Sequence, residues 1–212
     1  MFIEPNDRLL FIGDSITDVG RKRDDFYDLG KGYPKIVAEK LARDYPESHI
    51  EVLNRGIGGD KLINLRQRFD TDCLALKPDV VSILIGVNDV WHLMDKNEAL
   101  LTQGRLRAFE NDYRYLLDIL QAAGCSRIVL MEPYVLPHPE KRLRWRKHLD
   151  PRIHIIRTLA KEYHTKFVPL DGMLNALGIK DSYAYYTGKD GVHPTAAGHQ
   201  AIAKQWCDWV LD

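Results

Sequence analysis

Short apolar runs alternate with longer stretches of helical periodicity along the whole of this 212-residue chain. The runs are rich in Val, Ile and Leu, as strands buried on both faces are; they are Arg8–Ile12, Ile50–Leu53, Val80–Ile85, Arg127–Met131 and Lys166–Leu170. The clearest amphipathic stretch between them has apolar residues at three- and four-residue steps: Leu106, Phe109, Tyr113, Leu116, Leu117 and Leu120. Because strand–helix alternation requires crossover connections, we expect a parallel sheet with helices on both faces.

The same pattern predicts how the chain is organised. It contains no internal repeat, low-complexity tract or linker, and its length is typical of one domain. We therefore expect a single domain over residues 1–212. Its architecture is predicted to be α/β, a three-layer α/β/α sandwich around a central five-stranded parallel sheet.

The charge balance and the cysteines exclude several classes of protein. Thirty Lys and Arg residues balance thirty Asp and Glu residues, whereas binding nucleic acid or anionic lipid through bulk electrostatics requires a basic face. The cysteines are three, widely spaced and without a CxxC pair, which argues against a disulfide framework or a Cys-based zinc site. The N-terminus does not resemble a signal peptide, and no apolar run reaches the ~20 residues of a membrane span. We expect a cytoplasmic protein without a nucleic-acid or membrane partner.

Polar, glycine-rich segments follow the predicted strands. In open parallel sheets, ligands bind outside the carboxyl ends of the strands, so these segments are the candidates for a site. GDSITD begins at Gly13, NRGIGGD at Asn54 and GVNDVW at Gly86, and DGVHPT begins at Asp190, ahead of the last helix. That helix has Thr195 as its candidate N-cap.

These segments contain the residue types that acyl transfer needs. A serine hydroxyl is a weak nucleophile at neutral pH, and His193 is the candidate base for Ser15. Asp190 is placed to orient the imidazole and stabilise its charged form. The candidate oxyanion donors are the N–H groups of Ser15 and Gly59 and the side-chain amide of Asn88. Glycine at 59 would let the backbone approach a substrate closely.

Four motifs in this order resemble those of the SGNH (GDSL-type) hydrolases, from Gly13 to His193. The resemblance implies a flavodoxin-like α/β/α fold, and no cofactor or metal. It assigns Ser15 as nucleophile, Asp190 and His193 as its partners, and Gly59 and Asn88 as oxyanion donors. Gly59 is preferred to Gly58 because the family glycine usually stands five residues after the asparagine of its block.

Within that family, FIGDSITD, IGVNDVW and VHPTAAGH look closest to intracellular carbohydrate acetylesterases, particularly xylan acetylesterases. The implied reaction removes acetyl from a sugar hydroxyl through an acetyl-Ser15 intermediate, in a possible homo-oligomer. That branch has an aromatic residue before the Asp of the last motif, where this chain has Lys189. Tyr186 is a candidate replacement for the aromatic wall, with Asp14 and Trp91 as further substrate-binding candidates.

Structural alternatives exist for several of these residues. Asp14 is a typical loop-shaping residue at a strand–helix junction, and Trp91 is as well suited to packing under the next helix. The basic stretch Lys141–His148 is either a solvated face or a surface for sugars, anions or a second subunit.

Other functions fit parts of the pattern. A lipase, lysophospholipase or thioesterase of the same family would use the same catalytic residues, although no lid-like apolar segment is visible. A metal-dependent phosphoesterase would need converging metal-binding motifs that the sequence lacks. A non-catalytic carbohydrate-binding domain would be expected to have lost catalytic positions, and all of them are filled.

Overall fold

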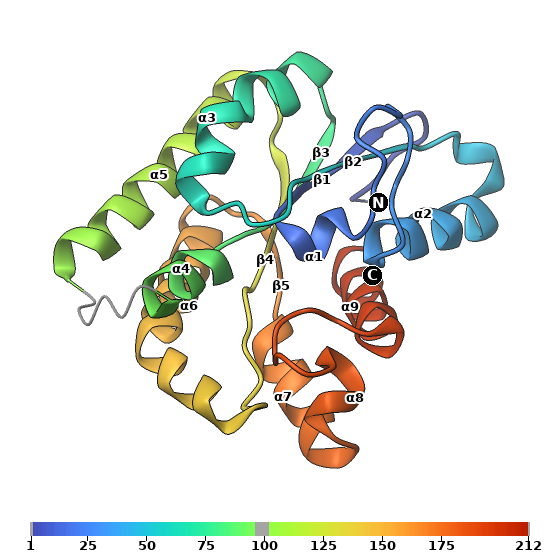
Figure 1. The fold of residues 1–212 in the computed structure, drawn as a ribbon. Coiled ribbons are helices and arrows are strands. Elements are labelled where there is room, and N and C mark those ends of the chain that lie inside the picture. The colour runs from blue at the N-terminus through green and yellow to red at the C-terminus, as the bar shows by residue number, and fades with distance from the viewer. Residues whose placement is uncertain (1, 96–101, 212) are drawn as a thin grey trace.

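The computed structural model describes residues 2–95 and 102–211. Its centre is a five-stranded parallel sheet in the order β2-β1-β3-β4-β5, with helices on both faces (Figure 1). The strands are β1 (Arg8–Gly13), β2 (Glu51–Gly56), β3 (Val80–Leu84), β4 (Arg127–Met131) and β5 (Lys166–Val168). The predicted α/β/α sandwich is confirmed, and its strand order is that of flavodoxin-like folds.

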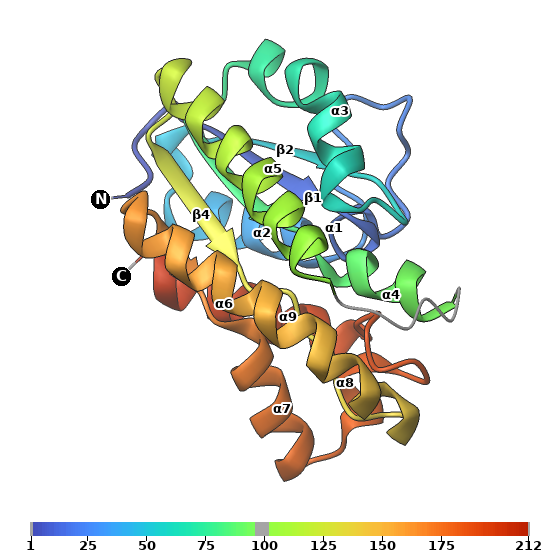
Figure 2. The same ribbon diagram turned by 90° about the vertical axis from the view of Figure 1, so that its left-hand side faces the viewer.

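Two helical layers cover the sheet (Figures 1 and 2). One layer contains α2 (Tyr33–Asp44), α7 (Leu170–Lys180) and α9 (Ala196–Val210), and the other contains α3 (Leu62–Asp72), α5 (Gln103–Ala122) and most of α6 (Arg146–Glu162). Shorter helices connect these elements: α1 (Ser15–Asp18), α4 (Val87–Asp95), α8 (Tyr183–Thr187), and the 3₁₀ turns η1 (Pro46–Ser48), η2 (Leu74–Leu76) and η3 (Glu140–Trp145).

Alternation along β1 explains why the sheet needs both layers. Leu9 and Phe11 pack into the core on the α2–α9 side, whereas Leu10 and Ile12 pack into the core on the α3–α5 side. All four side chains are fully buried. Successive side chains of a strand point to opposite faces, so a strand that is apolar at every position must be covered twice.

The predicted helices are present. The stripe on α5 is buried from Phe109 to Leu120, and Gly124 follows with a φ of +86°. Thr195 caps α9, because its side chain accepts a hydrogen bond from the Gly198 N–H. None of the described helices combines the length and apolar character that crossing a membrane requires.

Candidate active site

Ser15 lies at the carboxyl end of β1, as the first residue of α1. Asp14 is the N-cap of this helix, and its Oδ1 accepts a hydrogen bond from the Ile16 N–H at 3.0 Å. The N–H groups of a first helical turn have no partner within the helix. Ser15 therefore presents a hydroxyl and a backbone N–H at the same sheet edge.

His193 reaches Ser15 from the other end of the chain. The Oγ of Ser15 lies 2.9 Å from Nε2 of His193, and Nδ1 of His193 lies 2.6 Å from Oδ2 of Asp190. The second carboxylate oxygen of Asp190 accepts two backbone N–H groups, from Val192 and His193, both at 2.8 Å. A carboxylate held in this way fixes the orientation of the imidazole, and the imidazole can remove the serine proton.

Asp190 and His193 each stabilise the charged form of the other. The hydrogen bond that the His193 ring donates to Asp190 raises the pKa of His193 above its ordinary value of 6.5, against the effect of partial burial, and the charge of Asp14 raises it further. Burial alone would raise the pKa of Asp190, but hydrogen bonds from the His193 ring and from two backbone amides bring it below its ordinary value. The pair thus favours an anionic aspartate beside an imidazole that readily takes a proton.

Asn88, in the first turn of α4, and Gly59, in the loop after β2, approach the same edge. The Asn88 amide nitrogen donates to the Asp60 carbonyl at 3.1 Å, which fixes the amide plane and leaves its second N–H for a ligand. Gly59 has a φ of +85°, a conformation that favours glycine, and the space where a Cβ would lie is open. Glycine is therefore required here by backbone conformation, rather than by close approach of neighbouring protein atoms.

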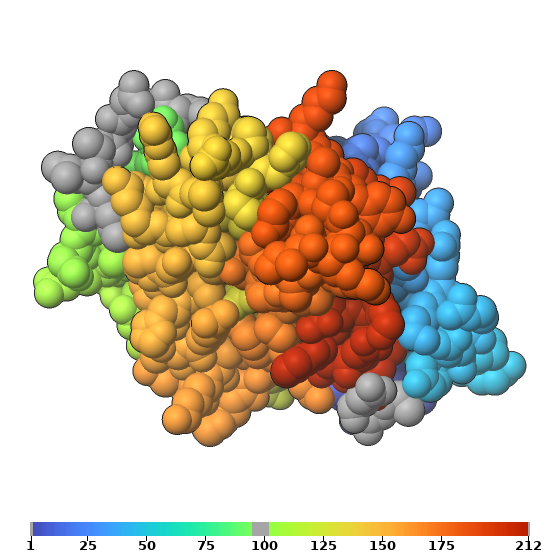
Figure 3. Space-filling model, turned by 90° about the horizontal axis from the view of Figure 1, so that it is seen from below, coloured from blue at the N-terminus to red at the C-terminus, as the bar shows by residue number. Residues whose placement is uncertain are grey.

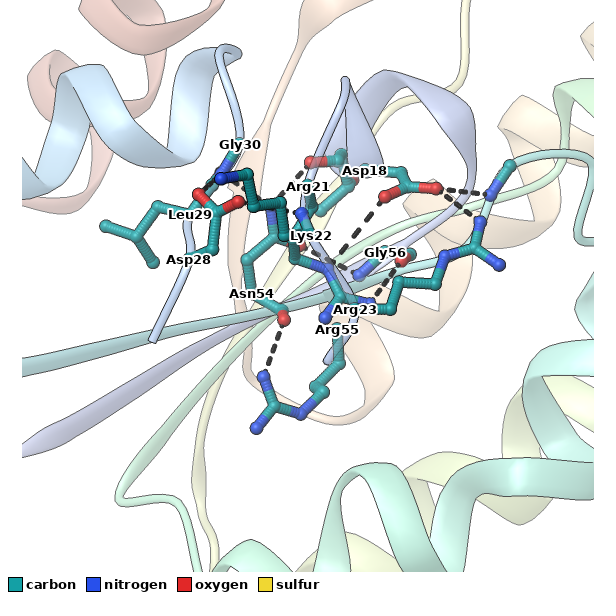
Figure 4. A network of polar contacts seen from close by, with 12 residues as sticks. Asp18, Arg21, Lys22, Arg23, Asp28, Leu29, Gly30, Asn54, Arg55 and Gly56 are labelled. Carbon is teal, nitrogen blue, oxygen red and sulfur yellow. Dashed lines mark hydrogen bonds and ion pairs between the residues drawn. The ribbon is translucent and has the colours of Figure 1, made fainter. Parts of the chain in front are cut away.

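A polar network holds the glycine loop against α1 (Figure 4). The Asp18 carboxylate accepts the Gly58 N–H at 3.0 Å and the Arg23 guanidinium at 2.6 Å. Asn54 is fully buried, and its amide nitrogen donates to the carbonyls of Thr17 and Leu29. These contacts join the segments after β1 and β2. They fix the candidate oxyanion donors of the two segments, the N–H groups of Ser15 and Gly59, in position relative to one another.

Asp14 is buried in a way that fits loop shaping better than ligand contact. The residue is 1% exposed, and its Oδ2 has no hydrogen-bond partner in the structure. Burial raises the pKa of Asp14 from 3.8 to about 7. Its substrate-binding role has no geometric support, although its charge acts on His193 through space.

Trp91 adjoins the candidate base and is also packed. Its ring centroid is 5.5 Å from that of His193 and 5.2 Å from that of Trp145. The Arg142 guanidinium lies 4.3 Å from the Trp91 ring and 3.8 Å from the Trp145 ring. The Trp91 ring is therefore packed and also lies beside His193, and its contact with a substrate stays a prediction.

The proposed role of Tyr186 has no support in the structure. This side chain is 7% exposed, and its hydroxyl donates to Asp181 instead of pointing toward His193. Its neighbour Tyr185 is 58% exposed, and Lys189 is exposed as well. The sequence indicated Tyr186 as a replacement for the aromatic wall, but α8 turns this side chain into the core.

The basic stretch Lys141–His148 is only partly a solvated face. Arg142, Trp145 and His148 are buried, whereas Lys141, Arg144 and Lys147 are exposed. Sequence reasoning did not single out Arg142; the one available signal was its spacing from Trp145, which places a cation beside an aromatic ring within a single 3₁₀ segment.

Across residues 2–95 and 102–211, no group of three or more His, Cys, Asp or Glu side chains is arranged to hold a metal ion.

Comparison with known proteins places this geometry in a family. Residues 11–201 match the GDSL-like Lipase/Acylhydrolase family, and an acetylxylan esterase of Geobacillus stearothermophilus is 36% identical over 220 aligned residues, which cover 99% of each chain. The chain belongs to this family. It is therefore a carboxylic ester hydrolase, as the motifs predicted.

Further relatives agree on the fold. A crystal structure of acetylxylan esterase from G. stearothermophilus superposes on this one with a TM-score of 0.88 at 33% identity, covering 99% of this chain and 96% of that one. A lipoprotein of Bacillus subtilis is 31% identical over 127 residues, about half of each chain. The first relative matches the whole α/β/α sandwich and the second only part of the sequence.

Proposed function

We propose that this protein is a serine esterase that removes acetyl groups from sugar hydroxyls, with acetylated xylo-oligosaccharides or similar carbohydrates as substrates. The observation that carries the proposal is the continuous contact from the Ser15 hydroxyl through His193 to Asp190, at 2.9 Å and 2.6 Å. The sugar class is supported by the full-length similarity to an acetylxylan esterase.

The reaction has two halves. His193 removes the Ser15 proton as the hydroxyl oxygen attacks the acetyl carbonyl, and the resulting tetrahedral oxyanion accepts hydrogen bonds from the Ser15 and Gly59 N–H groups and the Asn88 amide. The tetrahedral intermediate then collapses with cleavage of the bond to the sugar oxygen, which takes the imidazolium proton and leaves as a hydroxyl, so that acetyl-Ser15 remains. In the second half, His193 removes a proton from a water that attacks this ester; the bond to Ser15 Oγ breaks, the imidazolium returns the proton to Ser15, and acetate is released.

Acetate release from peracetylated xylose and xylobiose tests both parts of the proposal. Wild type should release acetate, while Ser15→Ala and His193→Ala should each lose most activity, with the double variant little worse because the residues act as a unit. Retention of sugar-acetate release by Ser15→Ala would overturn the serine mechanism.

Acyl-chain preference separates this proposal from a lipase or thioesterase of the same family. We expect faster turnover of p-nitrophenyl acetate than of p-nitrophenyl octanoate. Equal or better turnover of the octanoate, with no acetate released from the sugars, would refute the carbohydrate assignment while leaving the serine chemistry intact.

The cytoplasmic location, the homo-oligomer and the single-domain organisation stay predictions from the sequence.

A further inference from the structure

The loop that carries Asp190 and His193 is held by a different part of the chain, the β4–α6 connection (residues 132–145). Three consecutive carbonyls of this loop each accept a hydrogen bond from it: Asp190 from Arg142 Nε at 2.7 Å, Gly191 from the Leu136 N–H at 2.8 Å, and Val192 from the Tyr134 hydroxyl at 2.9 Å. Because the loop lies outside any helix or strand, its carbonyls depend on donors from elsewhere.

Close packing accompanies these hydrogen bonds. Gly191 has a φ of +75°, and a Cβ at this position would lie 2.2 Å from the His138 carbonyl oxygen and 2.6 Å from that of Leu136. Figure 3 shows the yellow surface of the connection directly beside the orange-red surface of the following C-terminal region. The two segments are therefore in backbone-to-backbone contact just before His193.

The connection is itself anchored on its other side. The Asp171 carboxylate, 6% exposed, accepts both guanidinium nitrogens of Arg146 at 2.7 Å and 2.8 Å and the Val135 N–H at 3.3 Å. Arg146 is the first residue of α6, directly after the connection, and a bidentate pair fixes position more strictly than a single hydrogen bond. The connection therefore links α7 to the loop of Asp190 through direct hydrogen bonds on both sides.

Arg142 is the member of this contact that also packs against the aromatic wall. The residue is 8% exposed, and its guanidinium lies over the rings of both Trp91 and Trp145. The Trp91 ring adjoins His193. One side chain therefore contacts both the backbone of Asp190 and the aromatic wall beside the imidazole.

We propose that the β4–α6 connection, chiefly through Arg142, positions Asp190 and His193 for proton transfer with Ser15. This inference rests on the proposed serine mechanism. Arg142 donates its Nε–H to the Asp190 carbonyl and does not contact the reacting atoms, so it is a positioning residue. Misplacing an acid–base group affects the chemical step more than substrate binding.

Two neutral variants of nearly equal length isolate the hydrogen bond. Arg142→Gln has an amide nitrogen at the position of Arg Nε along the side chain, whereas Arg142→Met has a methyl group there. Both remove the charge, and only Gln keeps an N–H donor at this position along the side chain. We expect Arg142→Met to lower kcat for p-nitrophenyl acetate about tenfold with little change in KM, and Arg142→Gln to recover most of that loss.

The same substitutions at Arg144, an exposed residue of η3, are the matched controls and should leave kcat unchanged. Tyr134→Phe removes only the hydroxyl that donates to Val192 and should lower kcat without raising KM, so it tests the connection even if the Arg142 variants fail to fold. Circular dichroism establishes folding of each variant.

Equal kcat values for Arg142→Gln and Arg142→Met, or an effect confined to KM, would overturn the role of Arg142. Wild-type kcat in Tyr134→Phe would overturn the role of the connection where the Arg142 variants do not fold. Failure of the serine mechanism has a separate signature, full hydrolysis of p-nitrophenyl acetate by Ser15→Ala.

Discussion

The buried Asp14 carboxyl should make the stability of this protein fall as the pH rises. Asp14→Asn is the appropriate perturbation, because asparagine is as good an N-cap as aspartate and can still accept the Ile16 N–H through its amide oxygen. The variant removes the ionisation and keeps the size of the side chain. Any constant effect of the amide group is independent of pH.

The magnitude follows from the shift in pKa. Burial raises the pKa of Asp14 from 3.8 to about 7 in the folded protein, so between these values the folded state binds a proton that the unfolded state has lost. Stability therefore decreases with rising pH in this window, by about 1.4 kcal/mol per pH unit. From pH 5 to pH 8, this amounts to about 2–3 kcal/mol.

Urea unfolding of wild type and Asp14→Asn at pH 5, 6, 7 and 8, followed by tryptophan fluorescence, measures the effect. The free energy of unfolding of the variant relative to wild type should increase by about 2–3 kcal/mol from pH 5 to pH 8. Contributions of titrating groups that do not interact with Asp14 are common to both proteins, and the interaction of Asp14 with His193 is part of the measured difference. A difference that stays constant over this range would show that Asp14 is ionised at pH 5 without cost, and would refute the reasoning.

Three further predictions concern the site and the core. The raised pKa of His193 means that the base becomes protonated at a higher pH than an ordinary histidine, so the acid limb of kcat/KM should have its midpoint above ~6.5; a midpoint below 6 would contradict the Asp190–His193 contact. Asn88→Ala should reduce kcat by about 10²–10³-fold, as loss of one oxyanion donor does, and an unchanged kcat in a variant with wild-type thermal stability would exclude Asn88 from that role. Cys73, Cys125 and Cys207 are buried, and burial raises the pKa of Cys125 and of Cys207 to about 11. A thiol reagent at pH 8 should therefore label none of the three in the native protein and all of them in urea, whereas rapid native labelling would indicate an opening that the structure lacks.

The sequence was sufficient for the sheet because most of its strands are apolar at nearly every position. A strand that is buried on both faces has an uninterrupted run of apolar residues, as Leu9 to Ile12 illustrate. Such a run can be recognised in the sequence without knowledge of the tertiary structure. Strand ends were less certain: β2 continues through polar Asn54 and Arg55 to Gly56, because both side chains bond to the backbone of neighbouring loops. Hydrophobicity alone does not encode such partners.

The site was predictable where chemistry fixes the residue type and unpredictable where packing decides orientation. Tyr185 and Tyr186 are adjacent on a five-residue helix, too short for periodicity to show which ring faces inward. Arg142 lies in a charged run typical of a solvated face, and only the tertiary structure places it against the rings of Trp91 and Trp145. Burial of a cation of this kind depends on partners from distant parts of the chain.

The contact between Ser15 and His193 joins residues 178 positions apart. A nascent chain leaving the ribosome would expose the serine early and the histidine late, so it would remain unreactive toward esters through most of its synthesis. Regain of esterase activity after dilution from denaturant would likewise require the loop of His193 to reach Ser15, which collapse of the sheet alone does not supply. Turnover is thus a direct probe of the contact between these two distant segments.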